Sequence, residues 1–179
     1  MGNKRMSLGR IEALLENQKR ELAFGAGTTF KGLRMATETL SSVGTHAAPT
    51  KTLVAADSGM QFFVDIGTVS IVAQLPTPAA GLTFKFVLSV ASDNEASKDF
   101  VVSTGDDAVD INGSVLVNGA HVEVTSATSA VIIDTSDGAA TVGDCLEFTC
   151  DGTDWYVTGS ILTASALNLT NAAAGHTVP

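Results

Sequence analysis

The chain is poor in cysteine, in basic residues and in aromatic residues. Its 179 residues include 2 cysteines, 10 lysines and arginines, and 1 tryptophan. On an extended strand Cys145 and Cys150 would lie about 17 Å apart on opposite faces, which is too far for a disulfide. We therefore expect no disulfide framework and a chain that folds in a reducing cytosol. No apolar run reaches membrane-spanning length, and the charged N-terminus does not resemble a signal peptide, so we expect no membrane partner.

Charge is divided unevenly along the chain, whose net charge is −9. Residues 1–34 contain seven basic and three acidic residues, a net charge of +4, whereas residues 35–179 contain three lysines and sixteen acidic residues, a net charge of −13. An acidic body repels nucleic acid. The basic arm has only Phe24 and Phe30 as aromatic residues that could stack on bases. We expect no nucleic-acid partner, and the arm is better suited to an acidic protein surface.

One segment has the period of an α-helix. Residues Ser7–Phe24 place apolar side chains three and four positions apart, with Ser7 as a possible N-cap and Gly25 as a possible C-cap. An isolated amphipathic helix of this length is unstable in water unless its apolar stripe is covered. The cover could be its own body, sister copies or another protein. A glycine-rich hinge completes an arm of residues 1–34, whose predicted interface residues are Leu8, Arg10, Ile11, Leu15 and Leu22.

The rest of the chain has the rhythm of β-structure. Short runs rich in β-branched and aromatic residues recur roughly every 8–12 residues between turn signals, and Asn-Gly or Asp-Gly pairs begin at Asn112, Asn118, Asp137 and Asp151. We predict a mainly β protein whose body is an antiparallel β-sandwich resembling a jelly roll. The predicted segments are an extended connector (35–50), the body (51–161) and an extended C-terminal strap (162–179). The predicted core residues are Phe84, Phe86, Leu146, Phe148, Trp155 and Val157.

No motif predicts catalysis or a cofactor. The three histidines, His46, His121 and His176, are not within metal-ligand spacing of another histidine or a cysteine. No serine lies in a Gly-x-Ser-x-Gly elbow. The acidic run Asp106–Gly113 resembles a calcium loop but lacks acidic residues at the first and twelfth EF-hand positions. A solvated acidic turn is favoured, with a cation site of another type as the alternative. We expect a protein that is not an enzyme.

Three segments resemble a β-rich module of tailed bacteriophage virion proteins. They are Thr52–Gly59, Leu75–Phe86 and Gly143–Val157. Such modules occur in capsid decoration (cement) proteins and in head or tail fibres, and the resemblance covers roughly residues 50–160. It implies a non-enzymatic structural protein, usually a homotrimer, and it supplies no catalytic residues.

The resemblance leads to two functional hypotheses. The first is a capsid decoration protein, assembled in the host cytoplasm and located on the virion surface, that binds as a trimer across major capsid protein subunits and stabilises the shell. The second is a trimeric head- or tail-fibre or tail-tip protein that contributes to host-surface binding, with recognition by the loops near residues 92–98, 104–114 and 135–144. Neither hypothesis requires a cofactor.

Overall fold

The computed structural model describes residues 36–41, 50–67, 70–90, 98–125, 127–134 and 140–170. The chain divides into a unit of residues 1–34 and a unit of residues 35–179, and every described residue belongs to the second unit. The predicted helix and hinge therefore lie outside the described residues. So do the predicted interface residues Leu8, Arg10, Ile11, Leu15 and Leu22.

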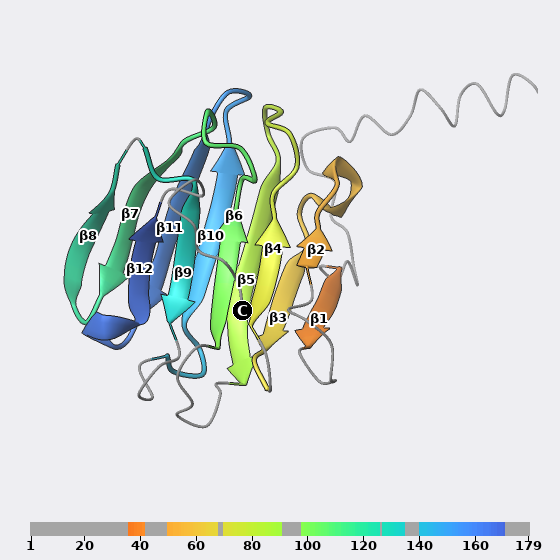
Figure 1. Ribbon diagram of the computed structural model, residues 1–179. Helices are drawn as coiled ribbons and strands as arrows, with labels where there is room; N and C mark the ends of the chain where they lie inside the picture. Colours follow the sequence, from red (N-terminus) through yellow and green to blue (C-terminus); the bar gives the residue numbers. More distant parts are fainter. Residues whose placement is uncertain are drawn as a thin grey trace, which may run out of the picture. The chain divides into compact units, whose positions relative to one another are not determined.

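The described residues form two β-sheets, and the protein is mainly β as predicted (Figure 1). Sheet A contains, in spatial order, β1 (Thr37–Ser41), β3 (Gln61–Asp65), β5 (Thr83–Val90), β10 (Cys145–Cys150), β11 (Trp155–Ile161), β7 (Ile111–Val117) and β8 (Ala120–Val124). Sheet B contains β12 (Leu167–Thr170), β9 (Ala130–Asp134), β6 (Asp99–Ser103), β4 (Ile71–Gln74) and β2 (Thr50–Thr52). Two short 3-10 helices are η1 (Ala55–Asp57) and η3 (Ala164–Ala166).

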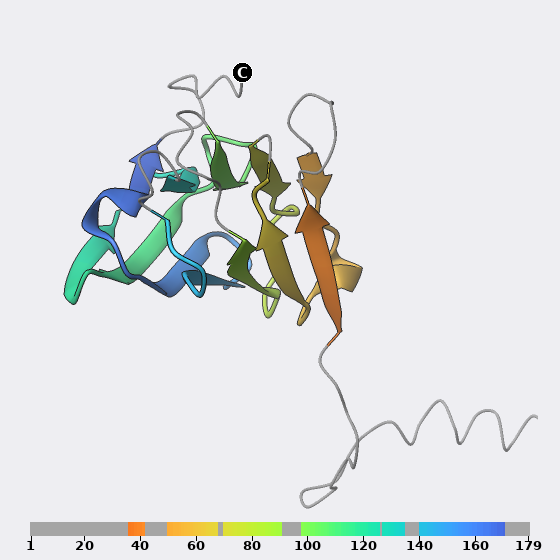
Figure 2. The same cartoon turned by 90° about the horizontal axis from the view of Figure 1, so that it is seen from below.

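The first six strands alternate between the two sheets. β1, β3 and β5 pair in parallel in sheet A, and β2, β4 and β6 pair in parallel in sheet B. A chain that crosses to the opposite layer after every strand returns to each layer in the same direction, so successive strands of one layer are parallel. This half of the body therefore winds through the two layers as a short solenoid, and Figure 2 shows the same strands from below.

The prediction of an antiparallel sandwich is wrong for half of the strand pairings. Of the ten pairings in the described part of the chain, five are parallel and five are antiparallel. A jelly-roll topology is not confirmed. Turn signals in a sequence identify hairpins between neighbouring strands. Four of the five parallel pairs instead join strands that are separated by one strand of the other sheet, and the fifth, β7 with β11, joins strands separated by three strands.

Two Asn-Gly pairs of identical sequence have different structures. Asn118 and Gly119 have φ values of 48° and 81° and form the tight turn of the β7–β8 hairpin, as predicted. The predicted turn at Asn112 is wrong, because Asn112 and Gly113 lie inside β7. Gly113 has φ 138°, and a Cβ atom there would overlap the backbone of Val157 on β11. Gly113 is therefore needed for the close approach of β7 to β11.

A shared core lies between the two sheets. The ring of Phe86 on β5 lies 5.4 Å from that of Phe62, 5.9 Å from that of Phe148 and 5.2 Å from that of Phe100. Phe100 belongs to sheet B, so this aromatic cluster joins the layers. All six predicted core residues, Phe84, Phe86, Leu146, Phe148, Trp155 and Val157, are buried in it.

The sheets extend beyond the predicted body at both ends. β1 falls in the predicted connector and pairs with β3, and β12 falls in the predicted strap and pairs with β9. The Lys51 ammonium lies 2.9 Å from the Glu38 carboxylate, which ties β1 to the edge strand of the other sheet. Both β1 and β12 are edge strands. The β1 sequence TETLS lacks the apolar alternation that marks a half-buried strand, whereas the β12 sequence LNLT has that alternation over only four residues.

Candidate functional site

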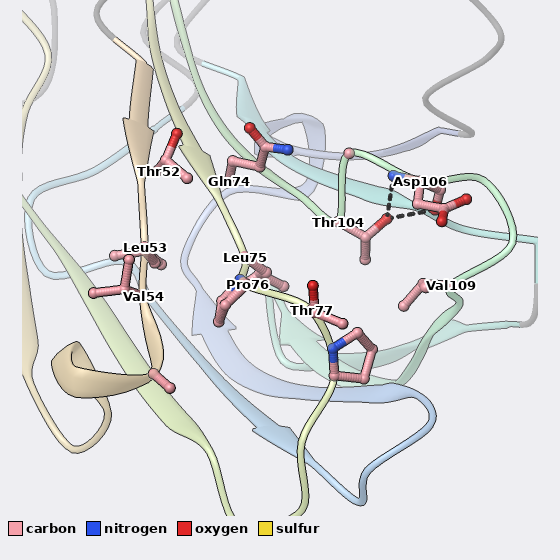
Figure 3. Close-up of a pocket in the computed structure, with 13 residues that line it drawn as sticks. Thr52, Leu53, Val54, Gln74, Leu75, Pro76, Thr77, Thr104, Asp106 and Val109 are labelled. Atoms are coloured by element: carbon pink, nitrogen blue, oxygen red, sulfur yellow. Dashed lines mark hydrogen bonds between the residues drawn. The ribbon is translucent and has the colours of Figure 1, made fainter.

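A surface pocket of about 570 Å³ lies where three parallel strands of sheet B end (Figure 3). β2, β4 and β6 run in the same direction side by side, so the segments that follow them emerge at one edge of the sheet. Leu53, Leu75 and Val109 supply an apolar part of the lining. The polar part of the lining comes from Thr52, Gln74, Thr77, Thr104 and Asp106.

One wall of the pocket is a turn held by its own polar groups. The Thr104 hydroxyl donates to the Asp106 carbonyl oxygen at 2.8 Å, and it accepts from the Asp106 backbone N–H at 3.4 Å (Figure 3). The Asp106 carboxylate accepts from the Ala108 N–H at 2.9 Å. Gly105 has φ 71°, and a Cβ atom there would overlap the side-chain amide of Gln74. The turn therefore packs directly on β4, and a larger residue at position 105 would displace Gln74.

The pocket can hold a small polar group above an apolar floor. Thr52, Gln74 and Thr77 offer hydroxyl and amide groups that can both donate and accept hydrogen bonds. The lining contains no histidine, cysteine or lysine, and Asp106 is its one ionisable side chain. Sequence reasoning missed this site because its parts come from three strand ends far apart in the chain.

The acidic run that resembled a calcium loop is a structural turn. Its carboxylates accept hydrogen bonds from three different groups: Asp106 from Ala108 N–H at 2.9 Å, Asp107 from the Ser129 hydroxyl at 3.1 Å, and Asp110 from Ala127 N–H at 3.0 Å. Across the described ranges, no group of three or more histidine, cysteine, aspartate or glutamate side chains is placed to hold a metal ion.

His121 lies on the exposed side of the edge hairpin and does not line the pocket. Its Nδ1 lies 3.1 Å from the Ser114 Oγ on the neighbouring strand β7. This is a cross-strand contact between polar side chains on a solvated sheet face. His46 and His176 lie outside the described residues.

A second carboxylate organises the β10–β11 loop. The Asp151 carboxylate accepts hydrogen bonds from the backbone N–H groups of Asp154 and Thr153, at 2.9 and 2.8 Å, and from the Tyr156 hydroxyl at 3.0 Å. These three bonds, with Asp154 the largest contributor, hold the pKa of Asp151 below its ordinary value because they stabilise the charged form. The bond to Asp151 also raises the pKa of Tyr156. Tyr156 remains 41% exposed on the outer face of sheet A.

Asp144 is a buried carboxylate that sequence reasoning did not single out. It is 3% exposed, and its two oxygens accept hydrogen bonds from the N–H groups of Thr141 at 2.8 Å and Leu162 at 2.9 Å. It thereby joins the turn before β10 to the end of β11. Nothing in the local sequence separates this aspartate from those in exposed turns, because its partner Leu162 lies 18 positions away.

Asp106, Asp107, Asp110, Asp144 and Asp151 thus accept hydrogen bonds within the fold. The pocket at the ends of β2, β4 and β6 is the best candidate for a binding site. Within the described ranges, no helix has the length and apolar character required to cross a membrane. No protein-family model matches the chain, and a search among curated proteins gives no match.

Proposed function

We propose that this chain is a non-enzymatic structural protein of a bacteriophage virion. In this proposal it is a capsid decoration protein that binds as a homotrimer across major capsid protein subunits and stabilises the shell. The amphipathic helix predicted for Ser7–Phe24 docks on the capsid through Leu8, Arg10, Ile11, Leu15 and Leu22. The body remains outside the shell.

The observation that carries the proposal is where the basic arm joins the acidic body. Residues 1–34, with a net charge of +4, continue directly into β1 at the edge of sheet A. The Ala36 carbonyl accepts a hydrogen bond from the Gln61 N–H at 3.0 Å, so pairing with β3 begins at the first described residue. An arm that departs from a sheet edge can bind a partner while the core stays intact.

Charge separation and multivalent binding are consistent with the same arrangement. Residues 35–179 have a net charge of −13, which favours repulsion between neighbouring particles. Three arms on one trimer would bind three capsid sites at once, and linked weak contacts bind far more tightly than each contact alone. A small attachment helix can therefore provide firm binding without a large interface.

The alternative is a trimeric fibre or tail-tip protein that contributes to host-surface binding. The pocket favours this alternative, because the segment 104–114, which was predicted as a recognition loop, supplies Thr104, Asp106 and Val109 to its wall. Its hydroxyl and amide groups suit a polar surface ligand.

Copy number in purified particles tests the choice between the two functions. Peptides of this chain should be counted by quantitative mass spectrometry against those of the major capsid protein. We expect a copy number of the same order as that of the capsid protein. A few copies per particle would refute the decoration function and favour the fibre. Absence from the particles would refute both.

Deletion of residues 1–34 tests the role of the arm. We expect the shortened protein to fold, with the fluorescence emission of a buried Trp155 retained. We also expect it to lose binding to particles that lack the native protein. The full chain is the matched control. Equal particle binding by the two proteins would contradict the attachment role.

A further inference from the structure

Strand β8 forms an open edge of sheet A. It pairs with β7 on one side only, and Figure 1 shows it as the outermost strand of its sheet, beyond β12 of the other sheet. The other edge strands, β1, β2 and β12, each adjoin a segment outside the described residues. A described hairpin, by contrast, joins β8 to β7.

The hairpin decides which backbone groups of β8 point outward. On β7, the Asn118 N–H donates to β11, so the groups of the preceding residue Val117 point to β8 and bond to Ala120. The direction of these groups alternates along a strand. His121 and Glu123 therefore turn their N–H and C=O groups away from β7. Within the described residues, no hydrogen bond satisfies these four groups. Unpaired strand edges of this kind are templates for pairing with another chain.

The side chains of β8 are complementary to a second copy of the same strand. If two β8 strands pair antiparallel about a two-fold axis at Val122, the outward groups of His121 in one copy face those of Glu123 in the other. Each of the two His–Glu pairs then exchanges both backbone hydrogen bonds and places an imidazole opposite a carboxylate. The His121 Nδ1 lies 3.1 Å from the Ser114 Oγ, which leaves Nε2 for the carboxylate.

Neighbouring registers lack this complementarity. An axis at position 121 would place two histidines opposite each other, and an axis at position 123 would place two carboxylates opposite each other, which repel. The axis at Val122 also brings two half-buried valines together on the inner face of the sheet. Side chains lie closest in such a pair because its backbone groups point away from each other. Charge, backbone pairing and apolar contact thus favour the same register.

We propose that two copies of this chain associate through β8, in antiparallel pairing centred on Val122, so that their A sheets become one continuous sheet. Two five-residue strands make a small contact, so the association is weak and reversible. The proposal does not rest on the virion function. A two-fold contact is separate from the three-fold contact of the proposed homotrimer, and between homotrimers it would join one trimer to the next.

Analytical ultracentrifugation of the full chain tests the contact, because pairing doubles the mass of the associating species as concentration rises. Glu123→Lys should weaken this doubling about tenfold, because it turns two attractive pairs into repulsive or neutral ones. His121→Glu should weaken it similarly. The two changes combined should restore it, since the opposite charges are then only exchanged. Glu147→Lys is the matched control, because it makes the same charge change on the exposed outer face of the central strand β10.

Three results would overturn the proposal. The first is a mass that never doubles, even at millimolar concentration. The second is a doubling that Glu123→Lys weakens no more than Glu147→Lys does. The third is a combined variant that remains as weak as the single ones. A stable trimer whose mass never doubles would refute the β8 contact and leave the proposed virion function intact.

Cysteine cross-linking tests the register independently. In a Cys145→Ser, Cys150→Ala background, Val122→Cys should form a disulfide between two chains under mild oxidation, because the axis places the two cysteines directly opposite each other. Ala120→Cys is the matched control, since it would lie opposite position 124 of the second copy and should not cross-link. Equal cross-linking of the two variants, or none at position 122, would refute the register.

Discussion

Replacement of Gly113 by alanine should be among the most damaging single-methyl changes in this protein. Gly113 lies in the middle of β7 with φ 138°, and it faces Val157 in the parallel β7–β11 pair. A Cβ atom at this position would overlap the Val157 backbone. Val157 cannot move away without disturbing both of its neighbours, because β11 also pairs with β10.

The expected loss is about 4 kcal/mol. A backbone conformation that L-residues rarely adopt costs about 1–3 kcal/mol, and forcing extra atoms into a packed interior costs about 1–3 kcal/mol more. Gly119→Ala is the matched control. Gly119 also has a positive φ, 81°, but a Cβ atom there meets nothing within 4 Å. That variant should lose only the conformational part, about 1 kcal/mol.

Equilibrium denaturation followed by tryptophan fluorescence measures both variants. The chain has 1 tryptophan, and Trp155 is fully buried and pairs with Ile111, two positions from Gly113. Its emission therefore reports on the same strand pair. If the Gly113→Ala protein is as stable as the Gly119→Ala protein, the close approach of β7 to β11 is not the reason for the glycine.

Three further predictions concern polar contacts. Asp144→Ala should lower the free energy of unfolding by about 2–4 kcal/mol, because it leaves two backbone N–H groups without their acceptor; unchanged stability in denaturant would contradict this. The single tyrosine should titrate above its ordinary pKa, so the Asp151–Tyr156 bond stabilises the fold below that ordinary pKa and is lost as pH rises through the folded-state value. Asp151→Asn should return the titration, followed by ultraviolet absorbance, towards the ordinary value; an identical midpoint in both proteins would refute the assignment. Lys51→Ala should lower the free energy of unfolding by less than about 1 kcal/mol, and by less still at high salt, because the ion pair with Glu38 is partly exposed. A larger loss of stability that does not depend on salt, measured by denaturant unfolding, would show that Lys51 has another role.

The sequence was informative where structure depends on residues close together in the chain. The alternation of Phe84 and Phe86, and of Leu146 and Phe148, predicted which side chains enter the core, since successive residues of a strand face opposite sides. The tight turn at Asn118 followed from the readiness of Asn and Gly to adopt positive φ. The mainly β class followed from the same local patterns.

The candidate site could not be predicted in this way. Gln74 and Gly105 are 31 positions apart in the numbering, and they meet only because β4 and β6 are parallel neighbours. Similarly, Asp144 resembles every other turn aspartate until the end of β11 places the Leu162 N–H against its carboxylate. Each of these contacts is a property of strand pairing, not of any short segment.

Local chemistry thus determined that this chain forms short strands, which side chains those strands bury, and that a basic arm precedes an acidic body. Tertiary structure alone decided that six strands wind alternately through two layers, that three of them end at one pocket, and that one Asn-Gly pair turns while the other lies inside a strand. The reason is that turn preference and side-chain alternation act over a few residues, whereas the choice of neighbouring strand is made by the burial of a shared apolar core.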